Sequence, residues 1–304
     1  MPSDPPPPAP RAPVLSARAR RAKLDRAAGT LAAADFLHVR AAEEAADRLE
    51  TVVRRFDRAL LCGPGAPYLR ERLTEAAGVE ATVIACETQR LSARVGADLA
   101  AWPDALPFGN GAFDLVVSLM ALHAVDDLPR ALAEARRVLR PDGLFLALFP
   151  GERTLEELRG ALREGEASVT GGLAPRVMPM VAVRDAGGLL QSVGFALPVA
   201  DTVTVRARYG DPARLLSDLR AMGETNVATA APRGGMRRAV AAAAMAAYPR
   251  DEEGRAPARF DLVALIGWAP DASQPRPLRP GSARVSLADA VREADRSEPD
   301  GGSG

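Results

Sequence analysis

The chain has 304 residues, of which 47% are hydrophobic and 26% are charged, a composition typical of a globular protein with one large domain or a domain with an insertion. The net charge is zero, so we expect no bulk attraction to nucleic acid or to an anionic membrane surface. Two cysteines are too few for a disulfide framework, and the sequence lacks both a membrane-spanning apolar run and a secretion signal, so we expect a cytoplasmic protein.

The N-terminal region is predicted to have two parts. Residues 1–14 are rich in proline, which favours an extended or disordered tail. Residues 15–56 are predicted to be helical, and the basic block between Arg18 and Arg26 is most simply a solvated helix face. His38 lies in this region, and we expect a structural role for it.

A turn containing glycine follows the first predicted strand. Residues 59–62 form a short apolar run, and Gly63 and Gly65 separate it from a helical segment. A glycine turn between a strand and a helix lets the backbone approach a ligand closely. We therefore expect Cys62, Gly63 and Gly65 to line a binding site.

The second predicted strand, residues 81–86, ends at Glu87. A carboxylate in this position can accept hydrogen bonds from both hydroxyl groups of a ribose. The alternative for Glu87 is a solvated surface glutamate, and the ribose role is the one we favour.

The clearest unit of the chain lies between residues 106 and 149. Residues 113–119 form an apolar strand, Asp127 marks the start of a helix that stops at Pro141, and residues 144–149 form a second apolar strand. Two strands joined by a helix form a βαβ unit, which predicts a parallel sheet covered on both faces.

Ligands of such sheets bind beyond the carboxyl ends of the strands, which directs attention to Ser118 and His123. We expect Ser118 to line the binding site. A neutral histidine can act as a base near neutral pH, so His123 is a candidate catalytic residue. Packing in the core is the alternative role for His123.

The C-terminal half alternates between the two kinds of element. Helices are predicted for residues 183–193, 211–222 and 234–248, and strands for residues 195–205 and 259–268, the last of them antiparallel.

A polar cluster follows the predicted helix 211–222. Glu224 and Asn226 either belong to a capping turn or, together with Asp218 and Arg220, line a substrate pocket. Prolines after residue 270 suggest a surface tail, and residues 291–304 are expected to be disordered.

The order of these pieces resembles a class I S-adenosylmethionine-dependent methyltransferase, through LPF at 106–108, FDLVVS at 113–118 and RPDG at 140–143. Over roughly residues 15–290, segments such as GERTLEELRGAL at 151–162 are similar to the mitochondrial complex I assembly factor 5 group. Proteobacterial relatives of that group are often described as biotin-synthesis-type methyltransferases.

This resemblance implies an α/β fold of the Rossmann-like methyltransferase type, with a seven-stranded, mostly parallel sheet. Residues 15–56 then form a helical lid, residues 57–150 the cofactor-binding half, and residues 151–290 a C-terminal half with a helical substrate insertion. The implied cofactor is S-adenosylmethionine.

The resemblance also implies roles near the cofactor. Related enzymes place an acid two residues before the LPF segment, which makes Asp104 the candidate adenine ligand and Asp98 its competitor. Ala105 and Leu106 are then expected beside the purine, and the resemblance supports the ribose role of Glu87.

The glycine turn departs from the family pattern, which has an acid followed by three alternating glycines. Leu61 stands where the first glycine belongs, and Ala59 stands where the acid belongs. This departure predicts weakened cofactor binding and leaves catalytic activity in doubt.

Three functions follow from the resemblance. The first is methyl transfer to a protein or acyl-carrier substrate; the second is hydroxylation of an arginine on an iron–sulphur subunit during assembly of respiratory complex I; the third is a non-catalytic assembly chaperone. The chain has only two histidines, His38 and His123, and they are far apart in sequence, so we expect no iron triad and no metal site.

Overall fold

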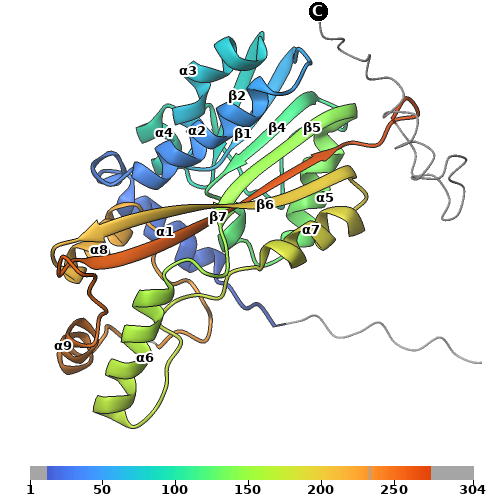
Figure 1. Cartoon of the computed structure of the whole chain (residues 1–304). Coiled ribbons are helices and arrows are strands. Elements are labelled where there is room, and N and C mark those ends of the chain that lie inside the picture. The colour runs from blue at the N-terminus through green and yellow to red at the C-terminus, as the bar shows by residue number, and fades with distance from the viewer. Residues whose placement is uncertain (1–11, 233, 275–304) are drawn as a thin grey trace, which may run out of the picture. The chain divides into compact units, whose positions relative to one another are not determined.

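A single sheet organises the protein, whose structure is a computed structural model described for residues 12–232 and 234–274 (Figure 1). Residues 1–11 of the predicted N-terminal tail (1–14) and all of the predicted C-terminal tail (291–304) lie outside the described residues. Contacts between residues divide the chain into two units, Met1–Pro270 and Asp271–Gly304, and the helices and strands described below belong to the first unit.

Seven strands are present among the described residues, in the sheet order β3-β2-β1-β4-β5-β7-β6. Their bounds are β1 Arg58–Cys62, β2 Ala81–Cys86, β3 Leu99–Ala100, β4 Phe113–Leu119, β5 Leu139–Pro150, β6 Ala196–Tyr209 and β7 Ala256–Trp268. Neighbours from β3 to β5 are parallel, whereas β7 runs antiparallel to both β5 and β6. The predicted seven-stranded, mostly parallel sheet and its antiparallel last strand are therefore confirmed.

The helices flank the strands on both faces of the sheet. They are α1 Ala17–Ala27, α2 Phe36–Glu50, α3 Ala66–Ala77, α4 Gln89–Val95, α5 Leu128–Val138, α6 Glu156–Thr170, α7 Val183–Ser192, α8 Pro212–Ala221 and α9 Arg238–Ala246, with 3-10 turns η1 Leu31–Ala33 and η2 Leu122–Ala124. No helix among the described residues is long and apolar enough to cross a membrane.

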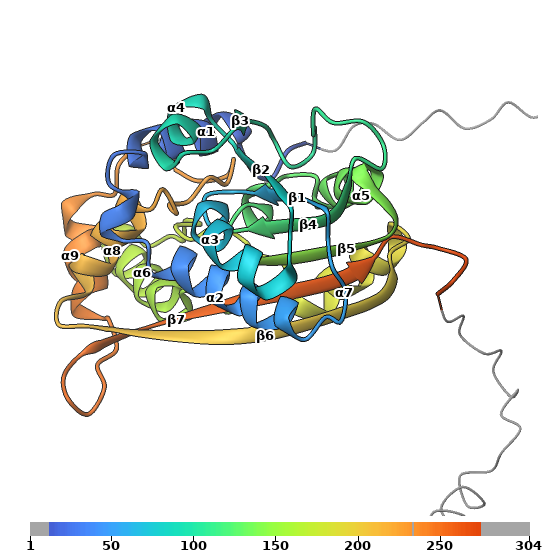
Figure 2. The same cartoon turned by 90° about the horizontal axis from the view of Figure 1, so that it is seen from above.

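Alternating side chains of β1 separate the two halves of the core, as expected for a strand that is buried on both faces. Leu61 belongs to the apolar cluster that includes Leu37 of α2 and Leu69 of α3. Leu60 belongs to the cluster that includes Leu132 of α5 and Leu190 of α7. Figure 2 shows α2 and α3 in front of the sheet, with α5 and α7 at its other side.

The N-terminal region is helical over most, but not all, of the predicted residues 15–56. It consists of α1, η1 and α2, and residues 51–57 are not helical. The α1 helix begins at Ser16, whose hydroxyl group accepts a hydrogen bond from the Ala19 N–H at 3.2 Å. The helix ends before Gly29 and Thr30, which have low helix propensity, so the chain turns there between α1 and α2.

The start of α5 agrees with the sequence, since the Asp127 side chain accepts a hydrogen bond from the Arg130 N–H at 3.0 Å. Its end does not agree, because α5 stops at Val138 and β5 begins at Leu139. Leu139 already pairs with Phe113 of β4, and a shift in register separates this pair from the regular ladder. Strand pairing therefore ends the helix before Pro141.

The segment between β5 and β6 confirms the predicted helical insertion. Its α6 helix extends away from the sheet and packs against α9 (Figure 1). A Cβ atom at Gly165 of α6 would lie 2.5 Å from the Ala244 backbone nitrogen, so this glycine permits the close approach of the two helices. The predicted helix over residues 234–248 is shorter than expected and begins at Arg238.

Candidate active site

The candidate site lies at the carboxyl ends of β1, β2 and β4. These ends are adjacent because Cys62 pairs with Ala85 on one side and with Ser118 on the other. The Gly63 N–H continues the pattern and donates to the Ala85 carbonyl oxygen at 2.8 Å. The α1 helix contacts both α4 and α8 (Figure 2), so elements from distant parts of the chain enclose this edge.

Arg20 of α1 is the centre of a buried charged cluster, and its side chain is 1% exposed. Its Nη1 atom donates to Glu224 Oε2 at 2.9 Å and to the Gly223 carbonyl oxygen at 3.4 Å. Its Nη2 atom donates to the Met120 carbonyl oxygen at 3.2 Å and to Glu87 Oε1 at 3.5 Å. One guanidinium group thus joins two carboxylates and two backbone carbonyl groups.

Both histidines of the chain belong to the same buried region. His123 Nε2 lies 2.6 Å from Glu224 Oε2, and both side chains are buried. His38 of α2 is fully buried, and burial lowers its pKa to about 4, with Glu224 opposing and Arg20 adding to the effect. The two histidines are therefore neighbours of one cluster although 85 positions separate them in sequence. No group of three or more metal-ligating side chains among the described residues is arranged to hold a metal ion.

The pKa values of the two glutamates of the cluster are shifted in opposite directions. Burial raises the pKa of Glu87, and the distant contact with Arg20 only partly opposes this effect. Burial would also raise the pKa of Glu224, but Arg20 and His123 together lower it below the usual range. Glu224 is therefore the firmly ionised partner of Arg20.

Many polar atoms of this region lack a hydrogen-bond partner. They are Arg20 Nε, Glu87 Oε2, Ser118 Oγ, His123 Nδ1, Glu224 Oε1 and both ring nitrogens of His38. Buried polar atoms are normally paired, because an unpaired one costs free energy. Their concentration in one place indicates that the site receives a polar ligand.

Two cavities adjoin the cluster on different sides. One, of about 520 Å³, lies beside Glu87 and Thr88 and is walled by Arg21 and Trp102. The Arg21 guanidinium group lies over the Trp102 ring, 4.9 Å from its centroid, and the Trp102 indole N–H has no partner. The other cavity, of about 610 Å³, reaches Glu224 from the side of α6 and α8.

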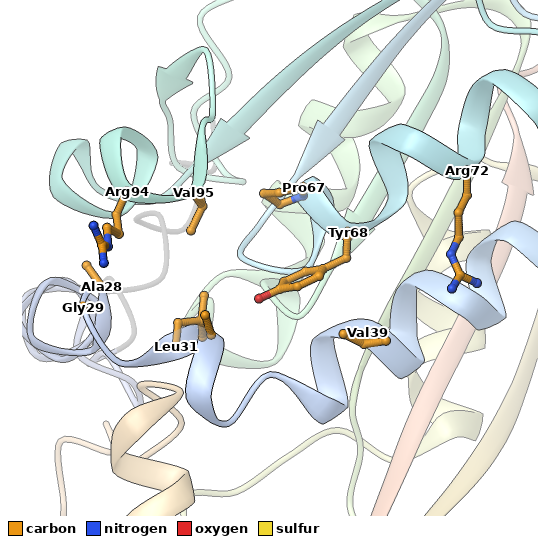
Figure 3. A pocket seen from close by; sticks show the side chains of 10 residues that line it. Ala28, Gly29, Leu31, Val39, Pro67, Tyr68, Arg72, Arg94 and Val95 are labelled. Carbon is orange, nitrogen blue, oxygen red and sulfur yellow. The ribbon is translucent and has the colours of Figure 1, made fainter.

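A third cavity, of about 530 Å³, lies under the connection between α1 and α2 (Figure 3). Figure 3 shows Tyr68 extending from α3 toward Leu31, with Gly29 and Arg94 at the far side of the cavity. Burial raises the pKa of the Tyr68 hydroxyl group, which stays protonated at neutral pH. The connection between the two N-terminal helices is therefore not packed tightly against α3 and α4.

Comparisons with known proteins agree with this geometry. A family model described as a methyltransferase domain matches residues 60–147. The mitochondrial arginine-hydroxylase NDUFAF5 of Danio rerio is 35% identical over 263 residues, which cover 84% of this chain and 82% of that protein. A malonyl-[acyl-carrier protein] O-methyltransferase of Laribacter hongkongensis is 33% identical over 279 residues, which cover 86% and 92%. The chain belongs to the class I S-adenosylmethionine-dependent methyltransferase family.

The fold agrees with that assignment. A solved structure of a Bacillus halodurans protein assigned as a methyltransferase, BH2331, superposes with a TM-score of 0.51 at 12% identity, covering 75% of this chain and 98% of that protein. The methyltransferase domain and fold imply binding of S-adenosylmethionine. The residues at the end of β2 fit the adenosine part of that cofactor, because Glu87 Oε2 needs a donor and the adjoining cavity has an aromatic wall.

The glycine turn of this methyltransferase-family protein is tightly packed against β4. Gly63 has a φ of +93°, and a Cβ atom there would lie 2.3 Å from the Leu119 carbonyl oxygen. A Cβ atom at Gly65 would lie 2.8 Å from the Leu119 Cβ. The sheet itself therefore requires both glycines. Burial raises the pKa of Cys62 to about 12, so its thiol stays protonated, and the cofactor contacts of Cys62, Gly63 and Gly65 stay predictions.

The predicted adenine segment lies beside the cavity at Glu87 and not in its lining. Trp102 and Ala105 form an isolated antiparallel β-bridge, and Ala105 is exposed. The Leu106 N–H donates a hydrogen bond to Glu134 Oε2 at 3.0 Å. The competing acid Asp98 accepts a hydrogen bond from the Ile84 N–H at 2.7 Å. The adenine roles of Asp104, Ala105 and Leu106 stay predictions, and Trp102 and Arg21 are lining residues that sequence reasoning missed.

Three of the four predicted substrate residues line the cavity that reaches Glu224. They are Arg220, Glu224 and Asn226, and apolar side chains of α6 such as Leu158 form part of the wall. Asp218 is not in this lining, because it forms a side-chain hydrogen bond with Tyr209 of β6. The alternative of a simple capping turn does not account for the buried ion pair of Glu224.

Arg20 is the main residue that the sequence interpretation placed wrongly. We expected it on a solvated basic face, whereas it is buried between two glutamates. A signal for this placement does exist: Arg20, Leu24 and Ala27 have the spacing of one helix face, and all three are buried.

Proposed function

We propose that this protein binds S-adenosylmethionine at the carboxyl ends of β1, β2 and β4 and methylates a protein or acyl-carrier substrate. The observation that carries the proposal is the set of unpartnered polar atoms around Glu87, Ser118 and His123. When bound, the cofactor supplies an electrophilic methyl group, so the protein mainly has to position the acceptor. The proposal assumes the cytoplasm as the compartment.

Separate residues of the chain bind the cofactor, exclude water and accept a proton. Glu87 Oε2 accepts hydrogen bonds from the ribose hydroxyl groups. The α1 helix, whose Arg20 is buried against Glu87, excludes water from the site. His123 Nδ1 takes a proton from the substrate nucleophile, because Glu224 fixes the other ring nitrogen and stabilises the protonated ring.

Replacing Glu87 with glutamine should weaken binding of S-adenosylhomocysteine by about 1.5–3 kcal/mol, the range for a hydrogen bond to a charged group. Isothermal titration calorimetry measures this change directly. The matched control is Glu80→Gln, because Glu80 is exposed and precedes the opposite end of β2. Equal affinities of the two variants would remove the ribose role from Glu87.

Arginine hydroxylation during assembly of complex I is the second candidate. Relatives that are named arginine-hydroxylase NDUFAF5 are 35% and 36% identical over most of this chain. The site moreover accommodates a guanidinium group, that of Arg20, between two carboxylates. The partner under this reading is an iron–sulphur subunit of complex I.

The candidates differ in measurable ways. Mass spectrometry of a modified substrate separates them, because a methyl group and a hydroxyl group add different masses. A protein that fails to bind either S-adenosylmethionine or S-adenosylhomocysteine would instead be a non-catalytic assembly chaperone.

A further inference from the structure

Two adjoining cavities form one groove beside the candidate active site. The cavity of about 610 Å³ that reaches Glu224 adjoins a cavity of about 710 Å³, which is lined by α6 and by the segment 171–182. That segment belongs to no helix or strand. The two cavities share part of their lining, namely Leu162, Arg176, Val177, Met178 and Met180. We call this pair of cavities the α6 groove.

The α6 groove is basic, although the chain has no net charge. Several cations of its lining form no ion pair with a carboxylate of the described residues; they are Lys23, Arg26, Arg159, Arg163 and Arg220. The acids of the lining are Glu152 and Glu224, and Glu224 is already paired with a buried arginine. The groove therefore has an excess of positive charge, which attracts an anionic partner.

Lys23, the only lysine of the chain, shows this excess most directly. Its ammonium group lines the groove and donates a hydrogen bond to the Asn226 carbonyl oxygen. Burial lowers the pKa of Lys23, the charges of Arg26 and Arg20 lower it further, and the charge of Glu224 opposes them. A carboxylate that binds beside Lys23 would relieve this repulsion between cations.

Much of the groove wall is apolar and adaptable. Three of the seven methionines of the chain, Met178, Met180 and Met236, line it together with leucine side chains of α6 and α8. Methionine side chains are unbranched and flexible, and they are common on surfaces that bind varied peptide sequences. Leu173, which is 67% exposed, extends the apolar wall outward. The occupant therefore needs apolar side chains as well as negative charge.

A polypeptide fits the groove better than other anionic partners do. Lys23 is partly buried in a cavity, so a flat membrane surface would not reach it. No aromatic side chain lines either cavity among the described residues, so nucleic-acid bases have no stacking platform there. Side chains of an extended peptide point alternately to opposite sides, so acidic and apolar side chains can contact different walls.

The groove also leads to the candidate active site. Glu224 lines its inner end, and Glu224 Oε2 lies 2.6 Å from His123 Nε2. We propose that the α6 groove docks an extended, acidic and apolar segment of the substrate protein, and that this docking places a neighbouring residue of the segment near His123. The inference rests on the proposed function, because it assigns the docked segment to the substrate of that site.

The test measures binding of acetyl-Asp-Leu-Asp-Leu-Asp-amide to the full chain by isothermal titration calorimetry. The double variant Lys23→Gln/Arg220→Gln removes one cation of α1 and one of α8. We expect it to bind the peptide about fivefold more weakly than the unchanged protein does, because two contacts between opposite charges are lost. The same peptide with asparagine in place of aspartate should bind weakly to both proteins.

Arg18→Gln/Arg214→Gln is the matched control. Both arginines are exposed, lie on the same two helices and are absent from the groove lining. Circular dichroism shows whether each variant is folded. If Lys23→Gln/Arg220→Gln does not fold, Arg163→Glu decides the question, because it reverses the charge of an exposed side chain in the other cavity. Equal affinities for the two peptides, or equal losses in the test and control variants, would overturn the proposal.

Two other ligands represent alternative occupants of the groove. Vesicles of phosphatidylcholine and phosphatidylglycerol in equal parts represent an anionic membrane surface, and 4′-phosphopantetheine represents the anionic arm of an acyl carrier. If either ligand binds in a manner that depends on Lys23 and Arg220 while the aspartate peptide does not bind, the groove belongs to that ligand and the proposal fails.

A parallel titration with S-adenosylhomocysteine separates this inference from the proposed function. If that ligand binds in a Glu87-dependent manner while the aspartate peptide binds all variants equally, the proposed function stands and the groove does not select acidic segments. If S-adenosylhomocysteine does not bind, the proposed function fails, and charge-dependent binding of the peptide still supports a docking groove.

Discussion

Replacing Glu224 with alanine should lower the free energy of unfolding by about 3–5 kcal/mol, the range for removing one partner of a buried ion pair. Glu224 is the nearer carboxylate of Arg20, at 2.9 Å against 3.5 Å for Glu87, and it also contacts His123. Its loss leaves the Arg20 charge buried with one distant counter-ion. Urea denaturation followed by circular dichroism measures the effect.

Two further variants separate the charge from the general cost of a substitution. Glu164→Ala is the control, because Glu164 is exposed on α6, and we expect a change within about 0.5 kcal/mol. Glu224→Gln keeps the shape and one acceptor oxygen but removes the charge, so its effect should lie between the other two. If Glu224→Ala costs no more than Glu164→Ala, the cluster does not stabilise the fold through ion pairing.

The sheet could be predicted from the sequence because its signals are local. The apolar runs at 59–62, 81–86, 113–119 and 144–149 each coincide with strand in the structure, and the helices between them dictate parallel pairing. The antiparallel pairing of β7 was also predicted. The predicted ends of helices and strands are less accurate where pairing with a strand distant in sequence determines them, as at Leu139, which pairs with Phe113.

The charged cluster could not be predicted in the same way. The contacts of Arg20 with Glu87 and Glu224 span 67 and 204 positions, and no local pattern encodes such pairs. The sequence predicts a role for Glu87 at a strand end and a separate role for Glu224 after a helix end. Their common partner became visible only when the packing of α1 was known.

The departure of the glycine turn has a structural explanation. Ala59 and Leu61 are fully buried, and both belong to the apolar cluster beneath α2 and α3. Restoring a glycine at position 61 would remove a core side chain, and an acid at position 59 would place a carboxylate among apolar neighbours. The altered residues thus contribute to the core, and weakened cofactor binding at this turn stays a prediction.

His38 should make the stability of the protein depend on pH between 7.5 and 4. Burial lowers its pKa in the folded state from 6.5 to about 4. A histidine with a lowered folded-state pKa stabilises the fold above its unfolded pKa, and this contribution is lost as the pH falls toward the folded value. At about 1.4 kcal/mol per pKa unit, the loss at pH 4 amounts to about 3 kcal/mol.

The measurement compares the unchanged protein with His38→Asn, which cannot titrate in this range. Carboxyl groups such as that of Glu224, which take up protons in the unfolded chain at the acid end, also contribute to the pH dependence. Both proteins share these groups, so the difference between the two stability curves isolates His38. Burial, Arg20 and His123 disfavour the charged ring of His38, whereas Glu224 and Asp35 favour it, and burial makes the largest contribution. The free energy of unfolding should therefore fall more steeply below pH 6.5 in the unchanged protein than in the variant. Parallel curves would contradict a neutral, buried His38.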